Sequence, residues 1–239
     1  DAVVLTHPHP DHLQGLLFIL QHFSVGEVWT NGDVSDIPLY ADFRRIISDR
    51  QIPLLVLSDL TPPKEIDGVT IRILNPPAMP SVPGTTTPYQ GEGTDSGESR
   101  HAAPSPPRRT LRESDAVNDR SLVIKLTFGS RSFLLPGDVS TATELRLAQS
   151  SGPLDSDVLF VPHHGGFRSS TVPFLEKVNP RLAVVSCGLD NVFRVPHPDV
   201  LRRFAQIRSQ VYRTDRDGAV TIETDGEGLR VRTFRAKNS

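Results

Sequence analysis

The sequence predicts an α/β fold in which helices cover the faces of a sheet. Residues 2–6, 27–30 and 53–57 are short apolar runs that end in polar loops, a pattern typical of buried strands. Between them, residues 13–23 and 39–50 repeat their apolar positions at the i, i+3, i+4 spacing of amphipathic helices. This alternation is the mark of helices packed on a sheet. A second observation, metal-ligand residue types directly after several apolar runs, predicts a site along one edge of that sheet.

The second half of the chain continues the alternation. Residues 69–74 alternate like a half-buried strand, and residues 122–128 and 132–135 form a predicted hairpin. Later predicted strands are residues 158–161, 182–186, 211–213, 219–224 and 229–234, and later predicted helices are residues 141–149, 172–178 and 200–207. We therefore expect residues 1–239 to form one domain, interrupted only between residues 75 and 117.

Residues 75–117 lose all periodicity. The stretch contains Pro-Pro, Pro-Gly, Thr-Thr-Thr and Gly-Glu-Gly sequences and almost no large aliphatic side chain. It buries too little apolar surface to offset the entropy cost of ordering. We expect a disordered surface insertion, and the alternative is a docking segment that uses Arg108, Arg109 and Arg112.

Composition excludes several classes of protein. The formal net charge is -2, so no global basic field attracts nucleic acid. Cys187 is the only cysteine, which rules out an internal disulfide. No apolar run approaches the roughly 18 residues of a membrane-spanning helix, and no signal peptide is recognisable. Because the chain starts at Asp1 inside a predicted strand, without an initiator methionine, we expect an excised domain.

The most informative stretch follows the first predicted strand and reads His7-Pro8-His9-Pro10-Asp11-His12. It places three imidazoles and one carboxylate close together in a loop stiffened by two prolines. These groups are the ligands that Zn²⁺, Mn²⁺ and Fe²⁺ prefer. The alternative is a solvated loop in which Asp11 caps the next helix, but packing explains so many ligand types poorly.

Further ligand types follow other predicted strands. Asp138, the pair His163-His164, and His197 each come after an apolar run. Six of the eight histidines therefore lie in loops after predicted strands, where α/β sheets place their sites. This segregation predicts a metal centre.

These motifs resemble the metallo-β-lactamase superfamily. The resemblance lies in His7-x-His9-x-Asp11-His12, Gly137-Asp138 and His163-His164-Gly165. The second half is also similar to the soluble domain of ComEC-type competence proteins, which carry DNA across the bacterial inner membrane. That similarity lies in Asn118-Asp119-Arg120-Ser121-Leu122-Val123, Phe133-Leu134-Leu135-Pro136-Gly137-Asp138, Val161-Pro162-His163-His164-Gly165-Gly166, Ala183-Val184-Val185-Ser186-Cys187-Gly188 and His197-Pro198. The resemblance implies a four-layer αβ/βα sandwich of the metallo-β-lactamase type, lacking its first strands.

The resemblance also implies two divalent metal ions, Zn²⁺ or Mn²⁺. The implied ligands are His7, His9, Asp11, His12, Asp138 and His164. The first two would hold one ion, the next two would hold the other, and the carboxylate of Asp138 would bridge them.

Two features of this site stay open. His163 and His197 are alternatives to His164 as the last ligand, although His164 best matches the Pro-x-His-Gly motif. The superfamily usually has a further histidine upstream of the bridging aspartate, and Asn118 occupies that region here. Because amide oxygens suit harder ions better than Zn²⁺, this departure favours Mn²⁺ or weak binding at the first ion.

The predicted function is hydrolysis of phosphodiesters in DNA during competence-linked DNA uptake. Water between the ions attacks phosphorus. Asp11 and His163 are the expected catalytic groups, the first handling a proton of that water and the second donating to a phosphate oxygen. The expected substrate contacts are Asn118, Ser121, Asn191 and His197. No small-molecule organic cofactor is expected.

Two other functions are considered. The same centre would also suit hydrolysis of a lactone, thioester or β-lactam. The chain would otherwise be a non-catalytic DNA-docking module of a transport channel, with phosphate contacts from arginines such as Arg168 and Arg202. The resemblance implies a soluble domain of a bacterial inner-membrane channel protein, on its periplasmic or extracellular face, whereas a free hydrolase would be cytoplasmic.

Overall fold

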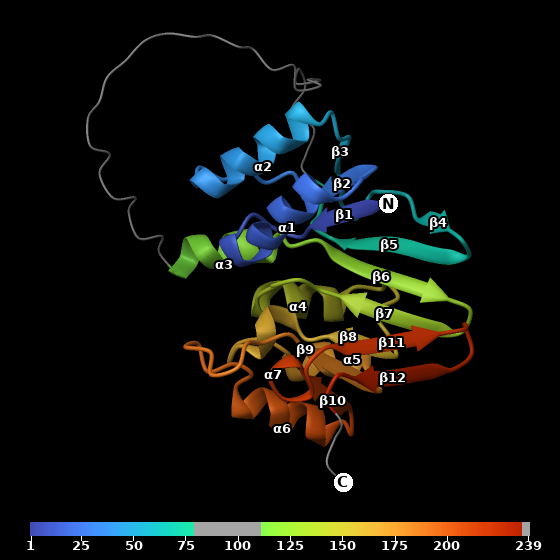
Figure 1. The fold of residues 1–239 in the computed structure, drawn as a ribbon. Coiled ribbons are helices and arrows are strands. Elements are labelled where there is room, and N and C mark those ends of the chain that lie inside the picture. Colours follow the sequence, from blue (N-terminus) through green and yellow to red (C-terminus); the bar gives the residue numbers. More distant parts are fainter. Residues whose placement is uncertain (79–110, 236–239) are drawn as a thin grey trace.

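The computed structural model describes residues 1–78 and 111–235, which form two main sheets with helices on their outer faces (Figure 1). Sheet 1 is parallel, with its strands in the order β1 (Ala2–Leu5), β2 (Glu27–Thr30) and β3 (Leu54–Val56). Helices α1 (Pro10–His22) and α2 (Pro38–Asp49) connect these strands. Both helices begin with proline, whose fixed φ suits the first helical turn.

Sheet 2 has its seven strands in the order β10-β9-β8-β7-β6-β5-β4. These strands are β4 (Lys64–Ile66), β5 (Val69–Asn75), β6 (Val123–Phe128), β7 (Arg131–Leu135), β8 (Val158–Phe160), β9 (Leu182–Val185) and β10 (Gln210–Arg213). Neighbours from β4 to β7 are antiparallel, and neighbours from β7 to β10 are parallel. The other elements are α3 (Leu111–Asp119), α4 (Thr141–Gln149), α5 (Val172–Val178), α6 (Pro198–Gln206), α7 (Thr214–Asp217) and the hairpin of β11 (Val220–Thr224) and β12 (Leu229–Thr233).

The alternation of side chains along each strand produces three apolar clusters that join the layers. Val3 and Leu5 of β1 pack in the cluster formed with α1 and α2, whereas Val4 joins a cluster with strands of sheet 2. In β6, Val123 packs in the cluster of α4, α5 and α6, and Ile124 lies in the cluster between the sheets. The layers therefore run helices, sheet 1, sheet 2, helices, which confirms the predicted four-layer αβ/βα sandwich.

The segment 75–117 differs from the expected disordered insertion at both ends. Asn75 is the last residue of β5, and its buried amide donates to the carbonyl oxygens of Asp119 and Ser121. Residues 111–119 form α3, so the helix begins before the predicted return of order at Asn118. The prediction relied on apolar content, whereas polar contacts of its last turn anchor this helix. Residues 79–110 of the predicted insertion lie outside the described residues.

Two short elements have no hydrophobic pattern that predicts them. All three side chains of β4 are exposed, and the strand pairs with β5 through backbone bonds. Helix α7 is a single turn of polar residues. Packing and backbone pairing determine such elements, so the spacing of apolar residues does not predict them.

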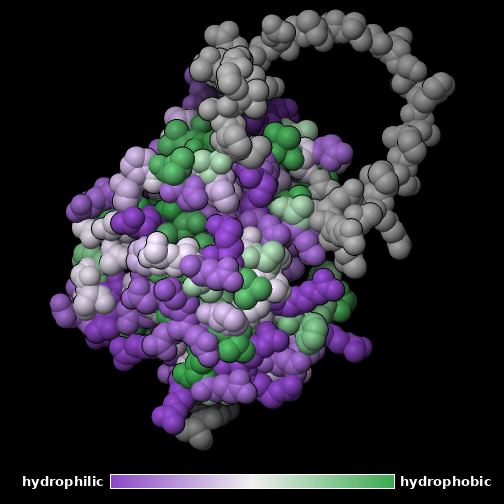
Figure 2. Space-filling view, turned by 180° about the vertical axis from the view of Figure 1, so that it is seen from behind, coloured by the Kyte–Doolittle hydropathy of each residue, from purple (hydrophilic) through white to green (hydrophobic). Residues whose placement is uncertain are grey.

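The described residues expose apolar side chains only in part of their surface. Within residues 1–78 and 111–235, no helix combines the length and apolar character needed to cross a bilayer. On the face turned away from the viewer in Figure 1, apolar side chains lie in several separate patches among polar ones (Figure 2).

A buried carboxylate fixes the loop of residues 166–171, which follows the histidine pair of the predicted site. Glu144 of α4 is fully buried, and its two oxygens accept hydrogen bonds from the backbone N–H groups of Ser170 and Thr171, each at 2.6 Å. From α6, the guanidinium of Arg203 donates to the carbonyl oxygens of Ser169 and Ser170 at 2.7 and 3.2 Å. Helix α4 therefore binds N–H groups of the loop, helix α6 binds its carbonyl oxygens, and together they hold the loop in place.

We predict that the free energy of unfolding falls with rising pH because of Glu144. Burial raises the pKa of this carboxyl from 4.5 to about 7, so the folded state holds more protons than the unfolded state between these values. Stability is then lost as the pH rises through that window, by up to about 3 kcal/mol. Urea unfolding near about pH 5 and about pH 8 measures the slope. The Glu144→Gln variant should lose this slope, whereas the exposed control Glu223→Gln should keep it; equal slopes in all three proteins contradict the prediction.

Candidate metal centre

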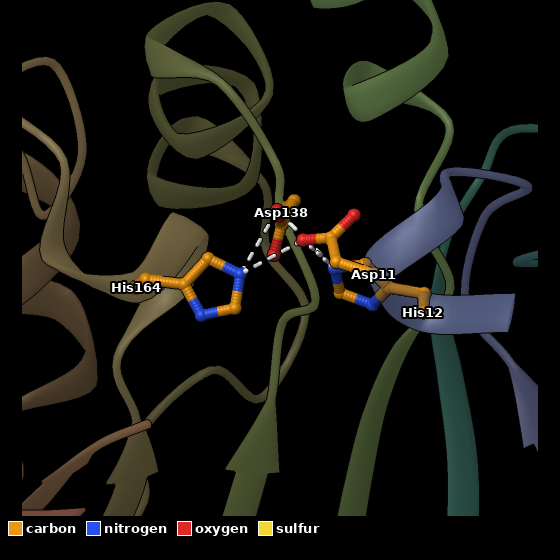
Figure 3. Close-up of side chains that lie close together, drawn as sticks. All are labelled: Asp11, His12, Asp138 and His164. Atoms are coloured by element: carbon orange, nitrogen blue, oxygen red, sulfur yellow. Dashed lines mark ion pairs between the residues drawn. The ribbon is translucent and has the colours of Figure 1, made fainter. Parts of the chain in front are cut away.

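Four side chains from three separate segments converge at one edge of the sheets. Asp11 and His12 lie in the first turn of α1, Asp138 follows β7, and His164 lies in the turn Pro162–Gly165 after β8 (Figure 3). One ligand atom from each of the four lies within 4.8 Å of the other three. The two halves of the chain each supply two donors, so the site exists only when both sheets are in place.

The distances between these atoms suit a shared cation. Nε2 of His12 is 3.6 Å from the carboxylate of Asp11 and 3.4 Å from that of Asp138. Nε2 of His164 is 3.5 and 3.6 Å from the same two carboxylates. Ligands of a tetrahedral Zn²⁺ at about 2.0–2.1 Å from the ion are roughly 3.3–3.5 Å apart. The measured separations are therefore those of a nearly closed coordination shell.

Two orphaned nitrogens support the same interpretation. Nε2 of His12 and Nε2 of His164 are buried and have no hydrogen-bond partner. Buried polar atoms in native proteins are nearly always satisfied, and an ion is one explanation when they are not. The donor set fits a divalent cation that accepts imidazole and carboxylate ligands.

Neighbouring groups orient both imidazoles. Nδ1 of His164 donates to the carbonyl oxygen of Ser186 at 2.9 Å, which leaves Nε2 facing the two carboxylates. Nδ1 of His12 is 3.4 Å from the hydroxyl of Thr6. Metal-binding histidines usually use their second nitrogen in this way. Neither Thr6 nor Ser186 was predicted; Thr6 adjoins the histidine motif, but a backbone carbonyl such as that of Ser186 leaves no signal in a sequence.

The backbone of the histidine turn is strained. His163 and His164 have φ values of +50° and +53°, in the left-handed region that residues other than glycine rarely adopt. Such conformations cost on the order of 1–3 kcal/mol each and cluster at functional sites. The strain turns the His164 ring back toward Asp138, where it meets the donors from α1.

The charges of the four groups depend on one another. The pKa of Asp11 is held well below its usual range, chiefly by the facing imidazole of His164. Burial opposes ionisation of Asp138, yet its contacts with His12 leave the pKa lowered. The facing carboxylate of Asp11, 3.5 Å from Nε2, raises the pKa of His164 to about 9. At neutral pH Asp11 and Asp138 are therefore ionised and His164 is protonated, and the two carboxylates attract cations.

His7 and His9 lie beside this cluster but outside the four-donor set. His7 is fully buried, with Nε2 at 3.1 Å from Nδ1 of His9 and Nδ1 at 3.1 Å from the Thr6 hydroxyl. Burial lowers the pKa of His7 to about 3, so its ring is neutral. An ion bound by both rings would have to replace the hydrogen bond between them.

Two predicted substrate contacts are buried around the site. Ser121 is fully buried, and its hydroxyl lies 3.2 Å from Nδ1 of His7 and 3.2 Å from the backbone N–H of Asp138. Asn118 is 2% exposed, and its side-chain oxygen has no hydrogen-bond partner. In the structure, Ser121 positions site residues, and Asn118 presents an unsatisfied oxygen.

The other predicted residues lie nearer the surface. His163 is partly buried, and its ring is not one of the four clustered donors. His197 caps α6, with Nδ1 accepting from the N–H of Asp199 at 3.2 Å. The amide of Asn191 bonds the carbonyl oxygens of Gly188 and Val195 and so braces its own loop. In the structure His197 is thus the N-cap residue of α6.

The comparisons with known proteins agree with this geometry. The sequence profile of the metallo-beta-lactamase superfamily matches residues 1–189. The chain therefore belongs to the metallo-β-lactamase superfamily, and with its four-donor site it is a metal-dependent hydrolase of that fold.

Individual proteins of known sequence or structure are also similar to this chain. Recombination protein 2 of Haemophilus influenzae is 34% identical over 124 residues, which are 52% of this chain and 16% of that protein. ComE operon protein 3 of Bacillus subtilis is 32% identical over 103 residues, 43% of this chain and 13% of that protein. The chain thus spans less than a fifth of these relatives and matches the predicted competence-protein likeness. CmlA, a diiron beta-hydroxylase from Streptomyces venezuelae, shares the fold, with a TM-score of 0.50 and 17% identity over 89% of this chain and 43% of that one.

We predict that Asp138→Asn and His164→Ala each weaken binding of a divalent ion by at least about tenfold. The first variant loses a carboxylate that would contact the ion, and the second loses an imidazole that would contact it. Isothermal titration with Zn²⁺ and with Mn²⁺ measures the affinities. His22→Ala is the matched control, since His22 lies in the last turn of α1. Equal affinities in His164→Ala and His22→Ala would remove His164 from the site.

Binding of the ion should also depend on pH. His164 must lose its Nε2 proton to bind a metal, and its pKa is about 9. Affinity should therefore rise by up to about tenfold per pH unit between about pH 7 and about pH 9, and then level off. The number of protons released, measured by titration in buffers of different ionisation enthalpy, should fall above that range. A constant affinity across the range contradicts a protonated His164.

Proposed function

We propose that this chain hydrolyses phosphodiester bonds in DNA. The observation that carries the proposal is the four-donor cluster of Asp11, His12, Asp138 and His164, in a chain related to Recombination protein 2 and ComE operon protein 3. A divalent ion bound there supplies positive charge for the phosphoryl oxygens and lowers the pKa of bound water toward about 7. A chain of net charge -2 needs such local positive charge to approach a polyanion.

The protein groups around the cluster have distinct roles in this proposal. The carboxylate of Asp11 is 62% exposed and ionised at neutral pH, so it orients the attacking water and accepts its proton. Asp138 is 8% exposed and serves as a fixed ligand. His163 and His197, both partly exposed beside the cluster, donate hydrogen bonds to phosphate oxygens.

We further propose a second ion, which His7, His9 and Asp138 would hold. The close approach of the two imidazoles supports this pair, with the His7–His9 hydrogen bond giving way to the ion. The unpartnered side-chain oxygen of Asn118 supports a hard ion such as Mn²⁺ over Zn²⁺.

A role in DNA uptake is proposed from the resemblance of the second half of the chain to ComEC-type competence proteins, with which these relatives agree. Since the matched segment is a small part of each relative, we propose that this domain works within a longer membrane-channel protein, on the outer face of a bacterial inner membrane. DNA is then the substrate.

Hydrolysis is tested with the whole chain and either metal on single-stranded DNA, double-stranded DNA and a nitrophenyl phosphodiester. We predict that Asp138→Asn and His9→Ala lower kcat by at least about a hundredfold, because the charge that stabilises the transition state is lost. Asp49→Asn, an exposed carboxylate at the end of α2, is the control and should change nothing.

The same assay separates the alternatives. Turnover of lactones, thioesters or β-lactams without turnover of DNA identifies a different hydrolase on this centre. DNA binding without any turnover identifies a docking module. DNA cleavage that survives Asp138→Asn unchanged overturns the proposed site.

A further inference from the structure

Two exposed phenylalanines lie on two loops whose backbones are bonded to the histidine turn or follow it directly. Phe167 is 57% exposed, in the loop that follows His164. Phe193 is 83% exposed and lies in residues 186–197, which connect β9 to α6. In the proposed function neither ring has a role.

The loops that carry the two rings are held rigidly. Asn191 bridges residues 188–197, accepting from the N–H of Val195 at 2.9 Å and donating to the carbonyl oxygens of Gly188 and Val195. The N–H of His197 donates to the carbonyl oxygen of Gly165 at 2.8 Å, which ties this loop to the histidine turn. The backbone that carries the two rings is therefore held in place, which reduces the ordering entropy lost when a ligand binds there.

Short paths connect the rings to the metal ligands. Phe167 is three residues after His164, and its ring meets the edge of His197 at 4.8 Å between centroids. The segment that carries Phe193 begins at Ser186, whose carbonyl oxygen accepts the hydrogen bond of His164. A polymer bound at the centre would extend across these loops.

Each exposed ring has an arginine as its next residue in the chain. Arg168 follows Phe167, is 76% exposed, and makes a long ion pair of 3.8 Å with Asp115. Arg194 follows Phe193 and is also exposed. Guanidinium groups contact phosphates, and aromatic faces stack on bases, and surfaces that bind single-stranded nucleic acid combine the two.

We propose that Phe167 and Phe193 form a platform on which unpaired bases of a single-stranded nucleic acid stack, while Arg168 and Arg194 contact its phosphates. The inference rests on the proposed function, since the platform delivers a strand to the same centre. Stacking requires bases that are not paired, so the substrate class becomes single-stranded nucleic acid. A lipid surface would also suit Val192 and Phe193, but it would not explain Phe167, which lies on another loop against His197.

The platform is tested by binding, without turnover. The whole chain, kept in EDTA, is titrated into a fluorescein-labelled single strand of about 12 nucleotides, and anisotropy is measured. Phe193→Ala and Phe167→Ala should each weaken binding by about fivefold to a hundredfold, the range for loss of one stacked base. Phe193→Trp should restore the affinity. Phe23→Ala is the matched control, because Phe23 is 54% exposed but lies at the far end of α1 from Asp11.

A strand with the same phosphates and abasic sugars identifies the source of the effect. Phe193→Ala should weaken its binding much less than that of the normal strand, because there are no bases to stack. Equal losses on both strands, or no loss on the normal strand, overturn the platform. Binding to phosphatidylcholine–phosphatidylglycerol vesicles that depends on Phe193, with unchanged strand affinity, shows instead a membrane contact. Stacking-dependent binding in a chain that never cleaves DNA sustains the platform and rejects the nuclease.

Discussion

The contact between the end of β1 and the turn after β7 is the constraint on which the site depends. The N–H of Leu122 donates to the carbonyl oxygen of Thr6 at 3.0 Å and joins the two sheets. Gly137 packs against this junction with φ +61°, where a Cβ would come within 2.9 Å of the Ser121 side chain. Glycine alone permits this approach without strain. The approach brings Asp138 to the first turn of α1, and without it the donors of the two halves would not meet.

Electrostatics then determines what the pocket accepts. Asp138 is buried, and a buried carboxylate is costly unless opposite charge compensates it. His12 and His164 provide that compensation in part, because both have Nε2 within 3.6 Å of the Asp138 carboxylate. Asp11 adds a second negative charge that stays open to solvent. One proton shared among these groups compensates the two carboxylates in part. A divalent ion in its place would compensate them better, because it carries two positive charges.

Much of the fold and part of the site were predictable from the sequence. Apolar spacing located most strands and helices, and ligand types after strands pointed to Asp138 and His164, which the structure brings together with Asp11 and His12. The spacing did not show that His7 would be buried, because its environment includes the hydroxyl of Ser121, which is far away in the sequence. Helix α3 was missed for a similar reason, since its anchors are polar contacts between parts of the chain far apart in sequence.

The shared turn of residues 162–167 has a thermodynamic consequence. The turn positions His164 for an ion, carries Phe167 at its end, and is bonded through Gly165 to the loop of Phe193. Because the segment is short and strained, a ligand that orders one part of it changes the binding free energy at the other part. Any such coupling is reciprocal, so an ion that favours strand binding by some factor is itself held more tightly by the strand, by the same factor. The domain would then retain its metal best while it is engaged with a strand.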